Sequence, residues 1–142
     1  MKLVIHTQFR ENYGAHDWDG EGACPQYWKC KGGSTYIVET NLDQAQDAGF
    51  YASVGRCIAH RSDYSEEFIL GESLVDECDF VESDHVEHWE SPTYATLVDG
   101  ALHCRKEQMS YCMDPRPVAL RTWVATPEGE SDFTYTKYEE AA

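Results

Sequence analysis

The sequence predicts an α+β fold: a mostly antiparallel sheet of about six or seven strands, with one main helix packed on one face. Three observations support this prediction. Apolar and polar residues alternate in several short runs, an Asp-Gly pair joins two of these runs, and the stretch after Asn41 has helical spacing. The chain has 142 residues, of which 42% are hydrophobic. This length and composition predict a single globular domain spanning residues 1–142.

The first third of the chain contains two predicted strands separated by a long loop. Lys2–Phe9 alternates between apolar and polar residues, which predicts an opening strand. Arg10–Gly33 has no sustained periodicity, and we expect an ordered loop there because it contains large rings. These rings are Tyr13, Trp18, Tyr27 and Trp28. Ser34–Thr40 is then predicted to be a second strand.

One helix is predicted after the second strand. Asn41 is suited to an N-cap, and Gln44 follows three residues later as in a capping box. Apolar residues continue at helical spacing through Leu42, Ala45, Ala48 and Ala52. We expect the helix to begin near Leu42 and either to end near Gly55 or to continue, with a break, toward His60.

The rest of the chain is predicted to be β. Ser62–Asp84 fits either a short helix followed by a strand or one bent strand, and we favour a strand around Phe68–Leu74. Asp99-Gly100 between Thr93–Val98 and Ala101–Arg105 predicts a hairpin with a type I′ turn.

Two further strands are predicted near the end of the chain, at Val118–Ala125 and Ser131–Tyr138. Met109–Pro117, which contains two prolines, is expected to be a connection before them.

The stretch Ser62–Cys104 carries charge of one sign. It contains no Lys or Arg, and it contributes strongly to the net charge of −15. Its twelve carboxylates are Asp63, Glu66, Glu67, Glu72, Asp76, Glu77, Asp79, Glu82, Asp84, Glu87, Glu90 and Asp99. Such a charge excludes binding to nucleic acid through phosphate contacts and disfavours anionic membranes. It favours basic protein surfaces, although the acidity could also serve only to keep the protein soluble.

The predicted partner-binding surface combines the acidic stretch with the aromatic loop. The first eleven carboxylates, from Asp63 to Glu90, would occupy a basic groove, since each presents charge and acceptor oxygens as a phosphate does. Exposed Tyr and Trp dominate many interfaces, so Tyr13, Trp18, Tyr27 and Trp28 would anchor the contact. The alternative is that the aromatic loop simply covers the core.

Metal binding is the main chemical alternative. Cys57-x-x-His60, His85-x-x-His88 and His103-Cys104 bring together residue types that bind zinc. They form neither paired CxxC motifs nor HExxH, and His103 and Cys104 would point to opposite faces of a strand. No cofactor is therefore predicted, with zinc at Cys57, His60, His85 and His88 as a weak candidate.

Two other chemistries are weaker. Asp17-x-Asp19-Gly-Glu21 resembles the start of a calcium loop, but the twelfth position is Trp28 instead of the closing Glu, so we expect a surface turn. Cys57 and His60 could pair as nucleophile and base, but no orienting third group or oxyanion motif accompanies them. The sequence therefore favours a non-enzymatic protein.

The compartment predicted is the cytoplasm. Met1–Phe9 is too short and polar for a signal peptide, and no stretch approaches the ~20 apolar residues of a membrane span. In that setting the six cysteines are expected to be free thiols or metal ligands. They are Cys24, Cys30, Cys57, Cys78, Cys104 and Cys112.

The opening of the chain, Met1–Glu39 (MKLVIHTQFRENYGAHDWDGEGACPQYWKCKGGSTYIVE), is similar to the starts of small uncharacterised proteins encoded by tailed bacteriophages. The resemblance covers about the first quarter of the chain and carries no assigned activity or functional residue. It implies a setting: small acidic phage proteins often bind host machinery, including as nucleic-acid mimics that block restriction, CRISPR or transcription proteins.

Taken together, these features predict an acidic binding protein that inhibits or redirects a host nucleic-acid-handling protein in the bacterial cytoplasm. Its partner would be a basic protein surface, with no direct nucleic acid and no membrane, and homodimer formation is left open. The alternatives are a zinc-binding domain or metal-dependent enzyme, and a small-ligand binding domain with a pocket between the sheet and the aromatic loop.

Overall fold

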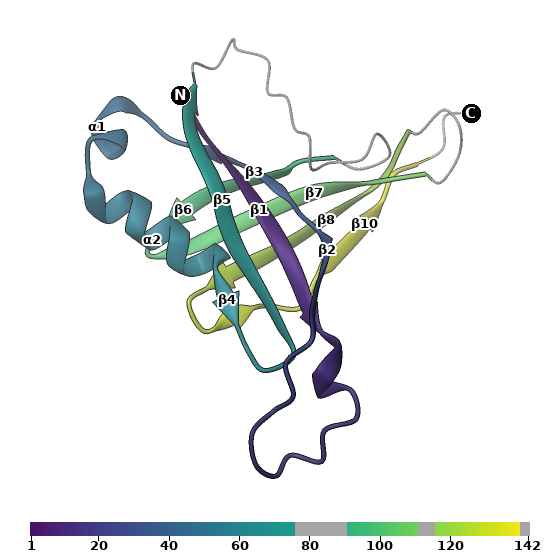
Figure 1. Ribbon diagram of the computed structural model, residues 1–142. Helices are drawn as coiled ribbons and strands as arrows, with labels where there is room; N and C mark the ends of the chain where they lie inside the picture. The colour runs from purple at the N-terminus through teal and green to yellow at the C-terminus, as the bar shows by residue number, and fades with distance from the viewer. Residues whose placement is uncertain (76–90, 111–115, 140–142) are drawn as a thin grey trace.

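The computed structural model describes residues 1–75, 91–110 and 116–139, and its main feature is one ten-stranded sheet (Figure 1). Strands make up 55% of these described residues and helices 15%, and the sheet curves into a nearly closed, barrel-like shape. The protein is therefore mostly β. The prediction of an α+β fold, with six or seven strands and a helix packed on one face of the sheet, is wrong.

The elements follow one another in chain order. The strands are β1 (Lys2–Asn12), β2 (Trp28–Gly32), β3 (Thr35–Glu39), β4 (His60–Arg61), β5 (Ser65–Val75), β6 (Thr93–Val98), β7 (Ala101–Met109), β8 (Pro117–Thr126), β9 (Gly129–Glu130) and β10 (Thr134–Lys137). The helices are a 3₁₀ turn, η1 (Tyr13–Ala15), and α1 (Leu42–Ala45) and α2 (Ala48–Ile58). The order across the sheet is β10-β8-β7-β6-β3-β1-β5-β4, with β2 beside β1 and β9 beside β8. Among the described strands, β3 and β6 pair in parallel and all other pairs are antiparallel.

Strand β1 organises half of this sheet. It pairs with β5 along nearly its whole length on one side, and with β3 and then β2 on the other. Its residues Leu3 and Ile5 are buried in the core, as the alternating pattern indicated, and Val4 on the opposite face is buried as well. The strand also continues through Arg10–Asn12, which the sequence had placed in a loop, because those residues find partners on both β2 and β5. Such distant partners leave no local periodicity.

Strands β2 and β3 together form one interrupted strand beside β1. At the interruption, the backbone N–H of Ser34 donates to Oγ1 of Thr7 at 3.2 Å, and the N–H of Thr7 donates to the carbonyl of Ser34 at 2.9 Å. A Cβ at Gly33 would collide with the carbonyl oxygen of Thr7. Only glycine fits this close backbone approach, so Gly33 allows the chain between β2 and β3 to pack directly against β1.

The predicted helix is in fact two helices. Oδ1 of Asn41 accepts the N–H of Gln44 at 2.9 Å and caps α1, as the capping pattern predicted. Two residues after α1 ends, Asp47 accepts the N–H of Gly49 at 2.8 Å and starts α2. The second N-cap interrupts the apolar run because its side chain satisfies the backbone of a new first turn. No helix among the described residues is long and apolar enough to cross a membrane.

Helix α2 lies in the opening of the curved sheet and contacts β5, β7 and β8 (Figure 1). It buries Phe50, Val54, Cys57 and Ile58 in a core with residues of β1, β3, β6, β7 and β8. Because β5 lies near one end of the strand order and β8 near the other, α2 bridges the two ends of the sheet. Side chains from this helix, together with the inward residues of the strands, fill the interior.

The predicted hairpin is confirmed. Strands β6 and β7 pair up to Val98 and Ala101, and Asp99 and Gly100 have φ angles of 50° and 79°. Positive φ at both central residues is the signature of a type I′ turn. Strand β8 is also close to its predicted range, and the last predicted strand is shortened to β10. Strand β9 lies just before the predicted start of that strand, and both β9 and β10 pair with β8.

Candidate functional site

Glu66 belongs to the acidic stretch but is buried and ion-paired. Arg10 donates from Nε to its Oε1 at 2.7 Å and also from Nη2, and Nε of Arg61 lies 3.6 Å from its Oε2. The guanidinium of Arg10 also lies over the rings of Trp28 and Phe68, at 5.6 and 5.3 Å from their centroids. Residue Glu66 is only 8% exposed, so its charge is used within the fold.

Glu67 points to the other side of β5 and is engaged there. Its Oε2 accepts the hydroxyl of Thr7 at 2.6 Å and that of Tyr36 at 3.3 Å. Burial raises the pKa of the Glu67 carboxyl, while the two hydrogen bonds act in the opposite direction. Burial likewise raises the pKa of the Tyr36 phenol, with the Glu67 charge as a second cause. Glu67 is therefore unavailable to an external partner.

The remaining carboxylates of the acidic stretch are either exposed or not among the residues that the structure describes. Asp63 is exposed just before β5, Glu72 is exposed on β5, and Asp99 is exposed in the hairpin turn. Seven others lie outside the described residues: Asp76, Glu77, Asp79, Glu82, Asp84, Glu87 and Glu90. The described part thus contributes Asp63 and Glu72 to the predicted contact, and it removes Glu66 and Glu67.

Asn12 organises the aromatic loop, a role that the sequence did not indicate. It is fully buried, and its Oδ1 accepts the N–H groups of Gly14 and Tyr27 at 3.0 and 2.8 Å. Its Nδ2 donates to the carbonyls of Pro25 and Asp63, both at 2.9 Å. The Asn12 side chain therefore connects, by hydrogen bonds, both ends of the aromatic loop and the turn before β5.

The aromatic loop is associated with positive charge. The Nζ atom of Lys29 lies 5.3 Å from the ring centroid of Tyr13 and 5.1 Å from that of Tyr27, and Nζ of Lys31 lies 4.9 Å from Tyr13. Contact with the Tyr13 hydroxyl raises the pKa of Lys31. Tyr27 is 57% exposed, whereas Tyr13, Trp18 and Trp28 are partly covered. The rings of Tyr13 and Tyr27 are cation-binding faces that the protein's own lysines already occupy.

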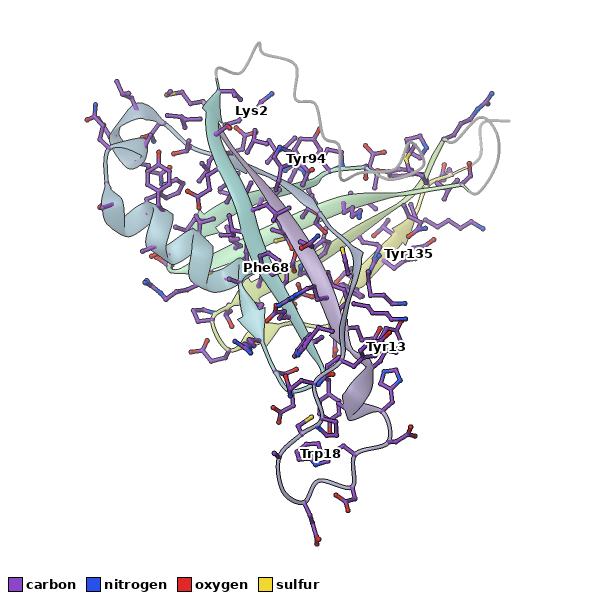
Figure 2. All side chains as sticks on the ribbon, viewed as in Figure 1. Lys2, Tyr13, Trp18, Phe68, Tyr94 and Tyr135 are labelled. Atoms are coloured by element: carbon purple, nitrogen blue, oxygen red, sulfur yellow. The ribbon has the colours of Figure 1, made fainter. Side chains whose placement is uncertain are left out.

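The aromatic loop and the end of β5 lie at opposite ends of β1. Val75, the last described residue before residues 76–90, pairs with Lys2, whereas Trp28 pairs with Asn12. Ten residues of strand span roughly 33 Å, and Figure 2 shows Lys2 and Trp18 at the two ends of the molecule. Val75, the residue that precedes 76–90, therefore lies far from the predicted aromatic anchors.

Cys57 and His60 do not form a metal site or a nucleophile–base pair. Sγ of Cys57 donates to the carbonyl of Gly100 at 3.3 Å, and Nε2 of His60 donates to the carbonyl of Cys57 at 2.8 Å. Burial raises the pKa of the Cys57 thiol, which disfavours the thiolate that either role requires. His85 and His88 lie outside the described residues, within which no three His, Cys, Asp or Glu side chains are grouped to hold a metal ion.

Cys104 and the calcium-like segment also have ordinary surroundings. Cys104 is buried and His103 exposed, so they lie on opposite faces of β7 as predicted. Burial raises the pKa of Cys104 to about 12. Oδ1 of Asp19 accepts the N–H of Glu21 at 2.9 Å, and Nε1 of Trp18 donates to the carbonyl of Glu21 at 3.0 Å. These bonds stabilise a surface turn.

One feature was not predicted at all: a groove of about 400 Å³ across β7 and β8. It is lined by Thr96, His103, Cys104, Arg105, Thr122, Trp123, Val124, Ser131, Asp132 and Thr134. Its residues come from four strands and from the connection before β10, which the strand pairing brings together, so no sequence motif could have revealed it.

Comparison with known proteins finds no protein family, no curated protein and no solved structure that matches this chain.

Proposed function

We propose that the protein is an acidic binding protein that inhibits or redirects a host nucleic-acid-handling protein in the bacterial cytoplasm. The distribution of charge carries this proposal. Residues 62–104 hold twelve carboxylates and no Lys or Arg, in a chain whose net charge is −15. Seven of these carboxylates fall within only fifteen residues, 76–90.

The structure supports a narrower contact surface than the sequence alone. Because Glu66 and Glu67 are engaged within the fold, the proposed contact is made by Glu72 and the seven carboxylates of residues 76–90. Asp63 is not part of it, because it lies beside Asn12 at the aromatic-loop end of β1. The aromatic loop is left out of this contact. Lys29 and Lys31 lie over its rings, and their charge would repel a basic partner.

The mechanism proposed is electrostatic mimicry of a nucleic-acid backbone. A series of carboxylates offers a basic groove the same charge-assisted hydrogen bonds that phosphates offer. Complementary charge speeds association and excludes other partners. Because exposed charges are screened by salt, the complex should weaken steeply as ionic strength rises.

The proposal is tested by affinity capture from bacterial lysate that has been treated with nuclease, at low salt, with elution in salt steps and mass spectrometry. Enrichment of one nucleic-acid-handling protein, eluting at moderate salt, is the expected result. A capture profile equal to that of an unrelated protein of the same net charge would show that the acidity serves solubility alone, and would refute the proposal.

A further inference from the structure

The groove across β7 and β8 lies on the outer face of the sheet. Thr96 and His103 of this face are exposed, whereas the next residues along the same two strands, Ala95 and Cys104, are buried at 3%. The groove is therefore open to solvent, and Cys104 and Trp123 in its lining also pack in or against the core. Its volume, about 400 Å³, lies in the range of small-molecule sites, roughly 300–1,000 Å³.

Strand register aligns the polar side chains of the groove in two adjacent rows. The first row runs Tyr94, Arg105, Thr122 and Thr134 across β6, β7, β8 and β10. The second row runs Thr96, His103 and Val124. Neighbouring strands are ~4.8 Å apart, and alternate residues along a strand ~6.6 Å apart. Arg105, His103 and Thr122 are therefore close enough to converge on one small group.

The donors in these rows are not used within the fold. Within residues 1–75, 91–110 and 116–139, neither the guanidinium of Arg105 nor the imidazole of His103 has a hydrogen bond or an ion pair. Arg105 is positioned by Tyr94, whose ring centroid lies 5.5 Å from its Cζ atom. An arginine without a carboxylate is notable here, because the chain has 26 carboxylates and only eleven Lys and Arg.

We infer that this groove is a binding site for a small phosphate monoester, whose phosphate is held by Arg105, His103 and the hydroxyl of Thr122. Arginine offers a planar pair of N–H donors that matches two phosphate oxygens at about 2.8 Å. Histidine and threonine add further donors to the same group. Asp132 lines the same groove, and its carboxylate accepts a hydrogen bond from a hydroxyl group of the ligand.

The charge around the groove selects a small ligand over a polymer. Asp132 and the net charge of −15 repel a nucleic-acid chain, which depends on many Lys and Arg contacts. A monoester places only one phosphate beside Arg105 and turns its neutral hydroxyl part toward Asp132. This site is independent of the acidic surface proposed above, and either one can fail without the other.

The test is a titration of the ¹⁵N-labelled full chain with inorganic phosphate and with glycerol 2-phosphate at constant ionic strength, followed by amide chemical shifts. Glycerol and acetate serve as comparison ligands. We expect saturable shifts, confined to residues 103–105, 122–124 and 131–134, with both phosphate compounds. Absence of saturation, or acetate binding as tightly as phosphate, would overturn the inference.

Single-residue variants test which side chains of the groove contact the phosphate. R105Q should weaken phosphate binding at least about tenfold, as expected for loss of a charged hydrogen-bond donor. D132N should instead tighten inorganic phosphate, because it removes a repulsive charge. K137Q is the matched control, since Lys137 is exposed on β10 but does not line the groove. Equal weakening by R105Q and K137Q would show a general charge effect and refute the site; H103Q replaces R105Q if that variant does not fold.

Discussion

Nε of Arg10 donates to Oε1 of Glu66 at 2.7 Å, while the same guanidinium lies over the rings of Trp28 and Phe68. The contact joins β1 to β5, because Arg10 and Glu66 lie directly opposite each other in the register of the two strands. It shows that a carboxylate within an acidic stretch can be a structural residue. The carboxylates of the acidic stretch therefore do not all contribute to an acidic surface.

Removing this carboxylate should lower stability. E66Q is expected to reduce the free energy of unfolding by about 1–2 kcal/mol, because it removes a charged hydrogen bond from a buried acceptor. The figure is modest because 39% of the Arg10 side chain is exposed, so solvent screens the pair. Urea denaturation measures it, with E72Q as the control, since Glu72 is exposed on the same strand. Equal effects of the two variants would contradict the structural role of Glu66.

Glu67 should make stability depend on pH. Burial raises its pKa in the fold above the ordinary value of 4.5, so the folded state binds more protons than the unfolded state just above that value. Its contribution to stability is therefore fully present at lower pH and is lost as pH rises through the raised pKa.

The E67Q variant isolates this effect. The free energy of unfolding of E67Q, minus that of the wild type, should increase as pH rises from about 4.5 toward neutrality. Urea denaturation of both proteins at matched pH values measures this difference in free energy. The contributions of the other titrating groups are the same in both proteins and cancel in the subtraction. A difference that stays constant with pH would mean that the Glu67 carboxyl is not perturbed in the fold.

Asn12 should control the stability of the aromatic loop. N12A leaves the buried N–H groups of Gly14 and Tyr27 without an acceptor, at a cost of about 1–3 kcal/mol for each unsatisfied group. Limited proteolysis within residues 13–27 should accelerate at the same time. N41A is the control, because Asn41 caps α1 at the surface and its loss costs only ~1 kcal/mol. If N12A is no more damaging than N41A, Asn12 does not organise the loop.

Gly33 should resist substitution. G33A places a Cβ against the carbonyl oxygen of Thr7, and we expect a loss of more than about 1 kcal/mol from the forced backbone shift. G71A is the comparison, because nothing lies within 4 Å of a Cβ at Gly71 and the substitution there should be neutral or slightly stabilising. Thermal or urea unfolding that ranks G71A below G33A would refute the close approach of β1 and β3.

The elements that the sequence predicted correctly are those encoded by neighbouring residues. Alternation predicted β1, the run Ser34–Thr40 predicted β3, the Asn41 capping pattern predicted the start of α1, and Asp99-Gly100 predicted the hairpin turn. The errors concern long-range pairing. Strand β2 lacks a local pattern because its register is set by β1, and the barrel-like curvature depends on α2 meeting both β5 and β8.

The candidate site shows the same limit. The carboxylates of Glu66 and Glu67 are adjacent in sequence and look alike, yet one binds Arg10 and the other binds Thr7 and Tyr36. Their partners lie about 30 to 60 residues away, so composition alone assigned both to the surface. The groove across β7 and β8 likewise depends on strand pairing, which brings residues of β6, β7, β8 and β10 together.

The central claim is that the location of the negative charge, and not its total amount, drives partner binding. It is tested most directly with two triple variants, E82K/D84K/E87K and D17K/E21K/E128K, titrated against the captured partner over a series of salt concentrations. Each replaces three acids by lysine, which adds 2 × 3 = 6 charges and changes the net charge from −15 to −9. Asp17, Glu21 and Glu128 are exposed and lie outside the acidic stretch. Circular dichroism verifies that both variants are folded.

We predict that the first variant binds at least about tenfold more weakly and with a flatter salt dependence, since it removes charges that contact the basic groove. The second variant should bind nearly as the wild type does. Equal weakening by both variants would show that only net charge matters, and undiminished binding by the first would show that the acidic stretch is not the interface. Either result would contradict the proposed function.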